Sequence, residues 1–236
     1  MILPIFNLDL SFQHLVAKIF FLSGIGSTIL EWPMARKPKK PAETLSYSLR
    51  NFDVVALGAS AGGLAALSRV LSGLPINFPS SIVVVQHLAP GHKSWIASLL
   101  DRSTRLKVKQ AEHGEILLPG IAYTAPPDQH LLVGPGKIQL AHSQLVHFSR
   151  PSIDLLFESV AGTYGSRSIG VVLSGSGRDG AAGARTIKEA GGITMAQLPD
   201  TAEFRHMPEA AIETGCIDFI LPLAEIGEKL AELCSR

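Results

Sequence analysis

The feature that most constrains the fold is a strand–turn–helix pattern over residues 53–71. Residues 54–57 form the short apolar run typical of a buried strand, and a glycine-rich turn follows at 58–63. Beyond the turn, apolar residues recur at the spacing of an amphipathic helix: Leu64, Leu67, Val70 and Leu71. Such a unit is typical of α/β sheets, and its tight turn lifts one side chain onto the exposed tip of the sheet.

That side chain is Ser60, which stands in the Gly-x-Ser-x-Gly pattern of a nucleophile elbow. The glycines permit a strained turn, and the start of the helix offers free N–H groups that can stabilise an oxyanion. A phosphate or dinucleotide loop is the alternative, because glycine-rich strand–helix turns also bind phosphates. The dinucleotide fingerprint requires glycine at position 60, so the turn favours the nucleophile.

Composition excludes several classes of protein. The chain has 236 residues, 46% hydrophobic and 17% charged, which suits one globular domain with an appendage and is too apolar for disorder. The formal net charge of +1 gives no reason to expect nucleic acid as a partner. Cys216 and Cys234 form no metal-ligand spacing, and so few cysteines fit a reducing cytoplasm. We therefore expect a cytoplasmic protein without a metal site.

Residues 1–51 are predicted to be an N-terminal extension with little packing, ahead of a domain over 52–236. Asp9, His14 and Lys18 interrupt the apolar start, so no uncharged window reaches the ~18 residues of a spanning helix. A basic, proline-containing stretch follows at 34–41. These features suggest no membrane insertion and the hypothesis that translation begins at Met34.

Two further strands end in residues suited to catalysis. His87 follows the apolar run 81–85, and Asp179 lies in a glycine-rich loop after the run 169–173. Because side chains past the carboxyl ends of parallel strands line one crevice, we expect Ser60, His87 and Asp179 to meet there. Each also has a plain structural interpretation: His87 as the end of a strand, and Asp179 as the N-cap of the helix that follows it.

The remaining pattern predicts an α/β fold with a mostly parallel sheet. An antiparallel hairpin over 130–133 and 137–140 is expected at the edge of that sheet, and Ser152 is expected to cap a helix. Further strands are predicted at 106–110, 121–124, 193–196 and 216–221, further helices at 94–100, 181–190, 209–214 and 223–233, and loops at 112–120 and 199–208.

Six ordered motifs resemble one family, the CheB-type catalytic domain of chemotaxis protein-glutamate methylesterases, from about residue 52 to 233. They are GASAGG (58–63), QHLAPG (86–91), YTAPPDQH (123–130), RPSID (150–154), LSGSGRDG (173–180) and MPEAA (207–211). The resemblance implies a three-layer α/β/α sandwich with a Rossmann-like sheet. It also implies Ser60 as nucleophile, His87 as base and Asp179 as the residue that orients His87.

The resemblance also implies a specific function. Members hydrolyse glutamyl γ-methyl esters on the cytoplasmic signalling domain of chemoreceptors, releasing methanol, and many also deamidate receptor glutamines. No metal or organic cofactor is implied. A methyltransferase or a separate regulator protein is a further expected partner, because the family typically carries a phosphorylated receiver domain of a phosphorelay, and residues 1–51 are too short to form one.

The chain departs from the family pattern beside the expected oxyanion site. Ala61 replaces the usual threonine after the serine, and Ser176 replaces the usual methionine in the aspartate loop. The expected oxyanion and pocket residues are Ala61, Gly62, Ser176, Gly177 and Arg178. Loss of an oxyanion donor typically lowers the rate by ~10²–10³-fold, so the two changes together are compatible with a slower enzyme.

Two competing functions are consistent with the same residues. In the first, the altered loops have weakened catalysis and the domain is a docking module for a receptor or methyltransferase; retention of all three triad residues argues against it. In the second, the domain binds a nucleotide. That function is disfavoured because the Gly-x-Gly-x-x-Gly spacing is missing and His87 stands where the second strand should end in an acidic residue.

Overall fold

The computed structural model describes residues 52–87 and 94–235. The predictions made for residues 1–51, an extension with little packing and a start at Met34, lie outside the described residues.

Seven strands form one sheet in the order β3-β4-β2-β1-β7-β8-β9, and every neighbouring pair is parallel. The mostly parallel sheet expected from the sequence is therefore confirmed. The three central strands β2, β1 and β7 are buried along their whole length, as the β-branched composition predicts. The strands are β1 Val54–Ala59, β2 Ser81–Gln86, β3 Lys107–Gln110, β4 Ile121–Thr124, β7 Ser168–Val172, β8 Ile193–Gln197 and β9 Phe219–Leu221.

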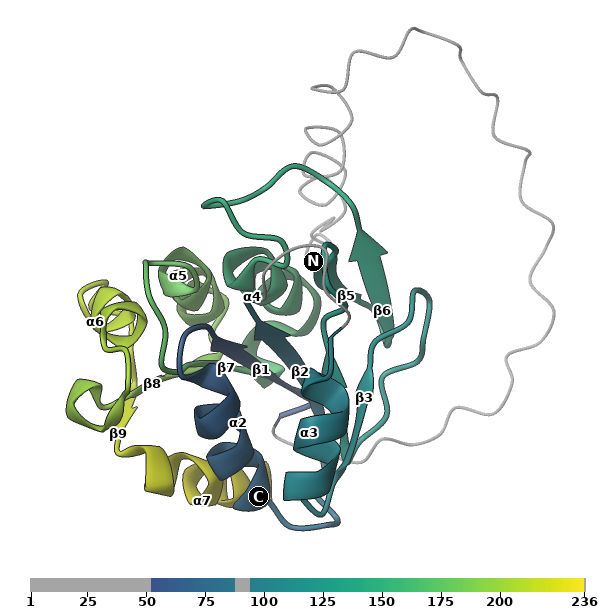
Figure 1. The fold of residues 1–236 in the computed structure, drawn as a ribbon, viewed down its shortest axis with the longest axis horizontal. Coiled ribbons are helices and arrows are strands. Elements are labelled where there is room, and N and C mark those ends of the chain that lie inside the picture. Colours follow the sequence, from purple (N-terminus) through teal and green to yellow (C-terminus); the bar gives the residue numbers. More distant parts are fainter. Residues whose placement is uncertain (1–51, 88–93, 236) are drawn as a thin grey trace, which may run out of the picture. The chain divides into compact units, whose positions relative to one another are not determined.

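Helices cover both faces of this sheet (Figure 1). The helices α2, α3 and α7 pack against one face and share an apolar core with side chains such as Leu57 and Val84. The helices α4, α5 and α6 pack against the other face, around side chains such as Ala56 and Val85. The expected three-layer α/β/α sandwich is confirmed. The helices are α2 Gly63–Ser72, α3 Ile96–Ser103, α4 Ile153–Tyr164, α5 Ala181–Glu189, α6 His206–Ile212 and α7 Leu223–Cys234.

The predicted hairpin is present as β5 His130–Gly134 and β6 Lys137–Ala141, which pair antiparallel. It forms a two-stranded sheet of its own, separate from the seven-stranded sheet that it was expected to extend. The reason lies in α4, whose polar side chains bond to the backbone of β5. The Val133 N–H donates to Ser159 Oγ at 3.0 Å, and Thr163 Oγ1 donates to the Val133 carbonyl at 2.9 Å. The hairpin therefore packs on α4 and does not pair with a strand of the seven-stranded sheet.

One helix begins earlier than the sequence pattern predicts. The loop expected over 199–208 contains a short 3-10 turn, Pro199–Thr201, and α6 begins at His206. Pro208 is therefore in the first turn of α6, where its missing N–H needs no partner inside the helix. The proline that indicated a loop is compatible with a helix start.

Candidate active site

Three neighbouring strands bring the predicted site residues to the carboxyl end of the sheet. Ser60 follows β1, His87 follows β2, and Asp179 lies in the loop after β7. Backbone bonds continue past the strand ends: the Ser60 N–H donates to the Ser174 carbonyl at 2.9 Å, and the His87 N–H donates to the Ala59 carbonyl at 3.0 Å. The strand ends therefore hold Ser60 and His87 at fixed positions.

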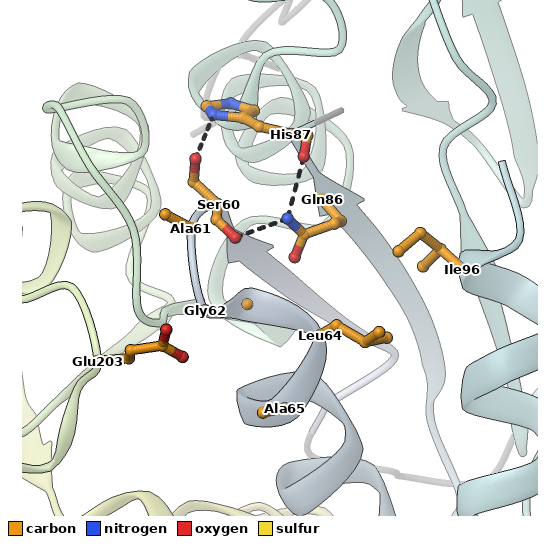
Figure 2. A pocket seen from close by; sticks show the side chains of 10 residues that line it. Ser60, Ala61, Gly62, Leu64, Ala65, Gln86, His87, Ile96 and Glu203 are labelled. Carbon is orange, nitrogen blue, oxygen red and sulfur yellow. Dashed lines mark hydrogen bonds between the residues drawn. The ribbon is translucent and has the colours of Figure 1, made fainter. Parts of the chain in front are cut away.

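The three side chains form a continuous chain of contacts. Ser60 Oγ lies 3.2 Å from His87 Nδ1, and His87 Nε2 lies 2.8 Å from Asp179 Oδ2 (Figure 2 shows the serine–histidine contact). An ionised carboxylate only accepts hydrogen bonds, so the proton of a neutral His87 is on Nε2. The Nδ1 lone pair then faces the serine hydroxyl. In the serine-protease triad Nε2 faces the serine and Nδ1 faces the aspartate. Here the two nitrogens are interchanged, and the ring still links the serine to the aspartate.

Asp179 is held by the start of α4. Its carboxylate accepts the N–H groups of Ile153 at 2.8 Å and Asp154 at 2.9 Å, and the Ser152 hydroxyl at 3.1 Å. Burial favours the neutral acid, yet the hydrogen bonds from His87 and from these two amides hold the pKa of Asp179 below its ordinary value. The carboxylate is therefore charged and fixed where it orients the imidazole.

The capping role considered for Asp179 is real, but for a different helix. The helix that follows Asp179 in the chain, α5, has Gly180 at its N-cap, which has no side chain to bind the first amides. Asp179 instead binds the first amides of α4, whose predicted N-cap Ser152 is confirmed by a bond from the Leu155 N–H. The sequence separation of 25 or 26 residues conceals this pairing.

Asp154 returns the same contact to α5. Its Oδ1 accepts the N–H of Gly180 at 2.9 Å and that of Gly183 at 2.7 Å. Burial, followed by the charge of Asp179, raises the pKa of Asp154. Each of the two buried carboxyl groups thus binds the start of the other segment's helix: Asp179, just before α5, binds α4, and Asp154, in α4, binds α5. The N-terminus of a helix dipole favours a negative group at both places.

The serine turn depends on glycine at two positions. Gly62 has a φ of 70°, a left-handed conformation that residues with a side chain rarely adopt. A Cβ at Gly63 would lie 2.1 Å from Gln86 Oε1 and 2.7 Å from Ala59 Cβ, so only glycine fits there. The chain can therefore turn tightly over Gln86 and point Ser60 outward.

Gln86 bonds to the backbone of both Ser60 and His87. Its Nε2 donates to the Ser60 carbonyl at 2.7 Å and to the His87 carbonyl at 3.0 Å (Figure 2). The side chain is buried, and its Oε1 has no hydrogen-bond partner among the described residues. The sequence places Gln86 in a family motif without a role, although its position directly before the predicted base His87 was the available signal.

A cavity of about 510 Å³ opens beside the serine. Among the described residues, neither the Ala61 nor the Gly62 N–H donates a hydrogen bond, so both are available at the cavity wall. The lining residues are Ser60, Ala61, Gly62, Gly63, Leu64, Ala65, Gln86, His87, Ile96 and Glu203. The exposed carboxylate of Glu203, which sequence reasoning missed, gives the cavity one negative side (Figure 2).

The other predicted pocket residues lie elsewhere. Ser176, Gly177 and Arg178 are exposed, and none of them lines the cavity beside Ser60. Gly177 and Arg178 border a separate hollow of about 240 Å³, where Arg178 pairs with Glu213 at 3.2 Å. The geometry thus brings Ala61 and Gly62 to the serine but not these three.

His130 is a further histidine near Asp179, which the sequence placed in the hairpin and in one family motif without a role. It is fully buried, its Nδ1 accepts the Ser152 N–H at 3.1 Å, and its Nε2 donates to the Gln144 carbonyl at 3.0 Å. Burial lowers the pKa of His130, which fits these neutral-ring contacts. It braces the residue whose hydroxyl binds Asp179.

The described residues offer neither a metal-binding cluster nor a membrane-spanning helix. They contain no group of three or more histidine, cysteine, aspartate or glutamate side chains placed to hold a metal ion. In the same part of the chain, no helix is both long and apolar enough to cross a membrane.

Comparisons with known proteins agree with one another. The family model described as CheB methylesterase matches residues 55–230. A protein-glutamate methylesterase/protein-glutamine glutaminase 2 of Anaeromyxobacter dehalogenans is 46% identical over 181 residues, which cover 77% of this chain and 53% of that protein. A putative protein-glutamate methylesterase/protein-glutamine glutaminase of Leptospira interrogans is 41% identical, covering 79% of this chain and 95% of that protein.

A solved structure extends the comparison to three dimensions. The crystal structure of the Thermotoga maritima CheB methylesterase catalytic domain superposes with a TM-score of 0.74 and 40% sequence identity. The match covers 77% of this chain and 98% of that domain. The chain therefore corresponds to one whole folded unit of the Thermotoga protein, and to about half the length of the Anaeromyxobacter relative.

Proposed function

Because the chain belongs to the CheB methylesterase family, we propose that it is a protein-glutamate methylesterase, a serine hydrolase that removes γ-methyl esters from glutamyl side chains. The proposed catalytic unit is the domain over 52–236. The observation that supports the proposal most directly is the contact chain from Ser60 Oγ through the His87 ring to Asp179, at 3.2 and 2.8 Å.

The first half of the reaction forms an acyl-enzyme. Ser60 Oγ attacks the ester carbonyl while His87 Nδ1 takes the hydroxyl proton, and Asp179 stabilises the charged imidazole. The free Ala61 and Gly62 N–H groups bind the developing oxyanion. As the C–OCH₃ bond breaks, the imidazolium returns the proton to the leaving oxygen, and methanol departs.

The second half restores the enzyme. Water attacks the acyl-enzyme carbonyl, His87 takes a proton from it, and the proton then passes to Ser60 Oγ as the acyl bond breaks. The product is a free glutamate side chain. A glutamine side chain passes through a similar tetrahedral intermediate and would release ammonia, so deamidation is part of the proposal.

The proposed substrate is the cytoplasmic signalling domain of a methylated chemoreceptor. The relatives are named for action on protein glutamate and protein glutamine, which supports a protein substrate. The exposed Glu203 at the cavity wall favours the neutral ester over the anionic product, since like charges repel.

Methanol release from a methylated receptor signalling domain tests the proposal. Wild-type protein should release methanol, and Ser60→Ala should abolish the release while still unfolding at the wild-type temperature. Release that persists in Ser60→Ala would exclude the serine as nucleophile. No release by the wild type, with receptor binding intact, would support the docking module in place of the enzyme.

A further inference from the structure

A tight turn with unusual residues lies between the hairpin and α4. Val146 and Ser149 exchange backbone hydrogen bonds, at 3.1 and 2.8 Å, so two residues form the turn between them. These are His147 and Phe148, with φ angles of 49° and 61°. Two-residue turns with positive φ at both positions strongly prefer asparagine and glycine. A histidine and a phenylalanine are held here against their backbone preference, which is typical of functional segments.

The turn lies close to a buried carboxylate on one side and is held by an arginine on the other. His147 Nε2 lies 3.3 Å from Asp154 Oδ2, the carboxylate that also caps α5. On the other flank, Arg150 donates to Asp128 Oδ1 from Nε at 2.9 Å and from Nη2 at 2.6 Å, and its Nη1 donates to the Ser143 carbonyl. The turn is therefore fixed to the same framework that holds the proposed catalytic aspartate.

The fixed turn presents apolar side chains to solvent beside the site. Phe148 is 98% exposed and Leu145 is 55% exposed. Together with His87 and Arg150 they line a hollow of about 120 Å³. This hollow and the larger cavity share His87 and no other lining residue, so both are adjacent to the imidazole. An exposed aromatic ring in a constrained turn has the character of an interface anchor.

From this placement we infer that Phe148 and Leu145 form a docking ridge for the protein substrate, which contacts an apolar side chain on the substrate surface next to the modified glutamate. The inference rests on the proposed function, and it explains how the enzyme would prefer a protein substrate over a small glutamyl ester. The ridge and the cavity beside Ser60 are both adjacent to His87, so a protein surface that brings its ester to Ser60 is in reach of the ridge.

Charge near the ridge supports an apolar partner. The Arg150 guanidinium is already paired with Asp128, which also binds His142 at 3.1 Å, and His147 faces Asp154. The Arg150–Asp128 pair therefore leaves little free charge on this flank of the ridge to attract an acidic or basic segment. The exposed aromatic and aliphatic surface is then the main source of binding energy that the ridge offers.

The test compares a large and a small substrate on one variant. Phe148→Asn removes the ring but suits the left-handed backbone, so the turn is retained. The substrates are a methylated receptor signalling domain and the γ-methyl ester of N-acetylglutamate. We expect kcat/KM for the protein to fall about tenfold, mainly through KM, and that for the small ester to change less than about twofold. Ile76→Asn is the matched control, because Ile76 is 70% exposed at the opposite end of the strands.

Each outcome bears on the inference. An equal loss on both substrates would overturn it, because the turn would then support the catalytic residues alone. Unchanged protein kinetics would overturn it as well. If wild-type protein hydrolyses neither substrate, the proposed function fails, and binding of the receptor domain to the wild type and to Phe148→Asn still decides whether the ridge docks it.

Discussion

Replacing Asp154 by alanine should destabilise the protein more than its position outside the proposed triad suggests. The Asp154 side chain is buried, and its Oδ1 is the acceptor for the first amides of α5, those of Gly180 and Gly183. Alanine leaves both N–H groups without a partner in a site closed to water. Asparagine keeps an oxygen at the same place and is the matched control.

The expected magnitude can be worked from these two bonds. A buried donor left without an acceptor costs about 1–3 kcal/mol, so Asp154→Ala should lower the free energy of unfolding by about 2–6 kcal/mol. That is a large fraction of the stability of an ordinary domain. Asp154→Asn exchanges charge-assisted bonds for neutral ones but also removes the repulsion from Asp179, and we expect a change within about 1 kcal/mol.

The pH dependence separates the charge of Asp154 from its role as acceptor. Burial, then the charge of Asp179, raises its pKa above the ordinary 3.8. The stability from a raised carboxyl pKa is fully present below the unfolded value and is lost as pH rises through the folded value. Asp154→Asn has no such loss, so its stability relative to wild type should improve as pH rises above 3.8. The pKa of Asp179 is lowered, so its contribution to the free energy of unfolding is lost in the opposite direction, as pH falls below 3.8. This loss is the same in the wild type and in Asp154→Asn.

Urea unfolding followed by circular dichroism, at about pH 5 and about pH 7, measures these differences. Two results would refute the reasoning. A loss below about 0.5 kcal/mol in Asp154→Ala would mean that the α5 amides find other acceptors. Equal losses in Asp154→Ala and Asp154→Asn would mean that the carboxylate charge, and not its acceptor oxygen, stabilises the helix start.

Four further variants test the site and the packing beneath it. Asp179→Asn should lower kcat/KM on a small glutamyl ester by about 10³–10⁴-fold, because an amide neither fixes the imidazole tautomer nor stabilises its charge; unchanged kinetics would exclude the triad. Gly58→Ala places a Cβ 2.3 Å from Ile153 Cγ2 and should cost about 1–3 kcal/mol in thermal unfolding, whereas Gly162→Ala, exposed on α4 with nothing within 4 Å, should stabilise by about 0.5–1 kcal/mol. Gln86→Met removes the amide that bonds two backbone carbonyls of the site and should lower kcat about ten- to hundredfold with little change in KM, measured on the same ester.

Local sequence patterns and one general rule of parallel sheets predicted the central strands and the proposed catalytic residues. Apolar runs located the strands, and the positions just after them identified Ser60, His87 and Asp179 as neighbours. The rule applies because parallel strands end at one edge of the sheet. Ser152 as a helix cap was predictable for the same local reason.

Contacts that depend on how distant segments pack were not predictable from the sequence. The exchange of carboxylates between α4 and α5 joins residues 25–29 apart, and no local signal distinguishes it from ordinary N-capping. The direction of the loop after β7 was equally hidden. Gly177 adopts a φ of 89°, and Ser176 and Arg178 beside it face solvent and not the serine. The hairpin docked on α4 because Ser159 and Thr163 offered polar partners that a helical pattern does not reveal.

The exchanged carboxylates also have a consequence for motion. If the first turn of α4 opens, Asp179 loses two amide donors, and α5 loses the carboxylate of Asp154 in the same event. The two helix starts therefore form one cooperative opening unit, whose amide protons exchange with solvent at a common rate. Molecules with this unit open have no oriented imidazole. The proposed turnover would then depend on the local closing equilibrium of two helix ends, and it would fail at a lower temperature than the one at which the domain unfolds.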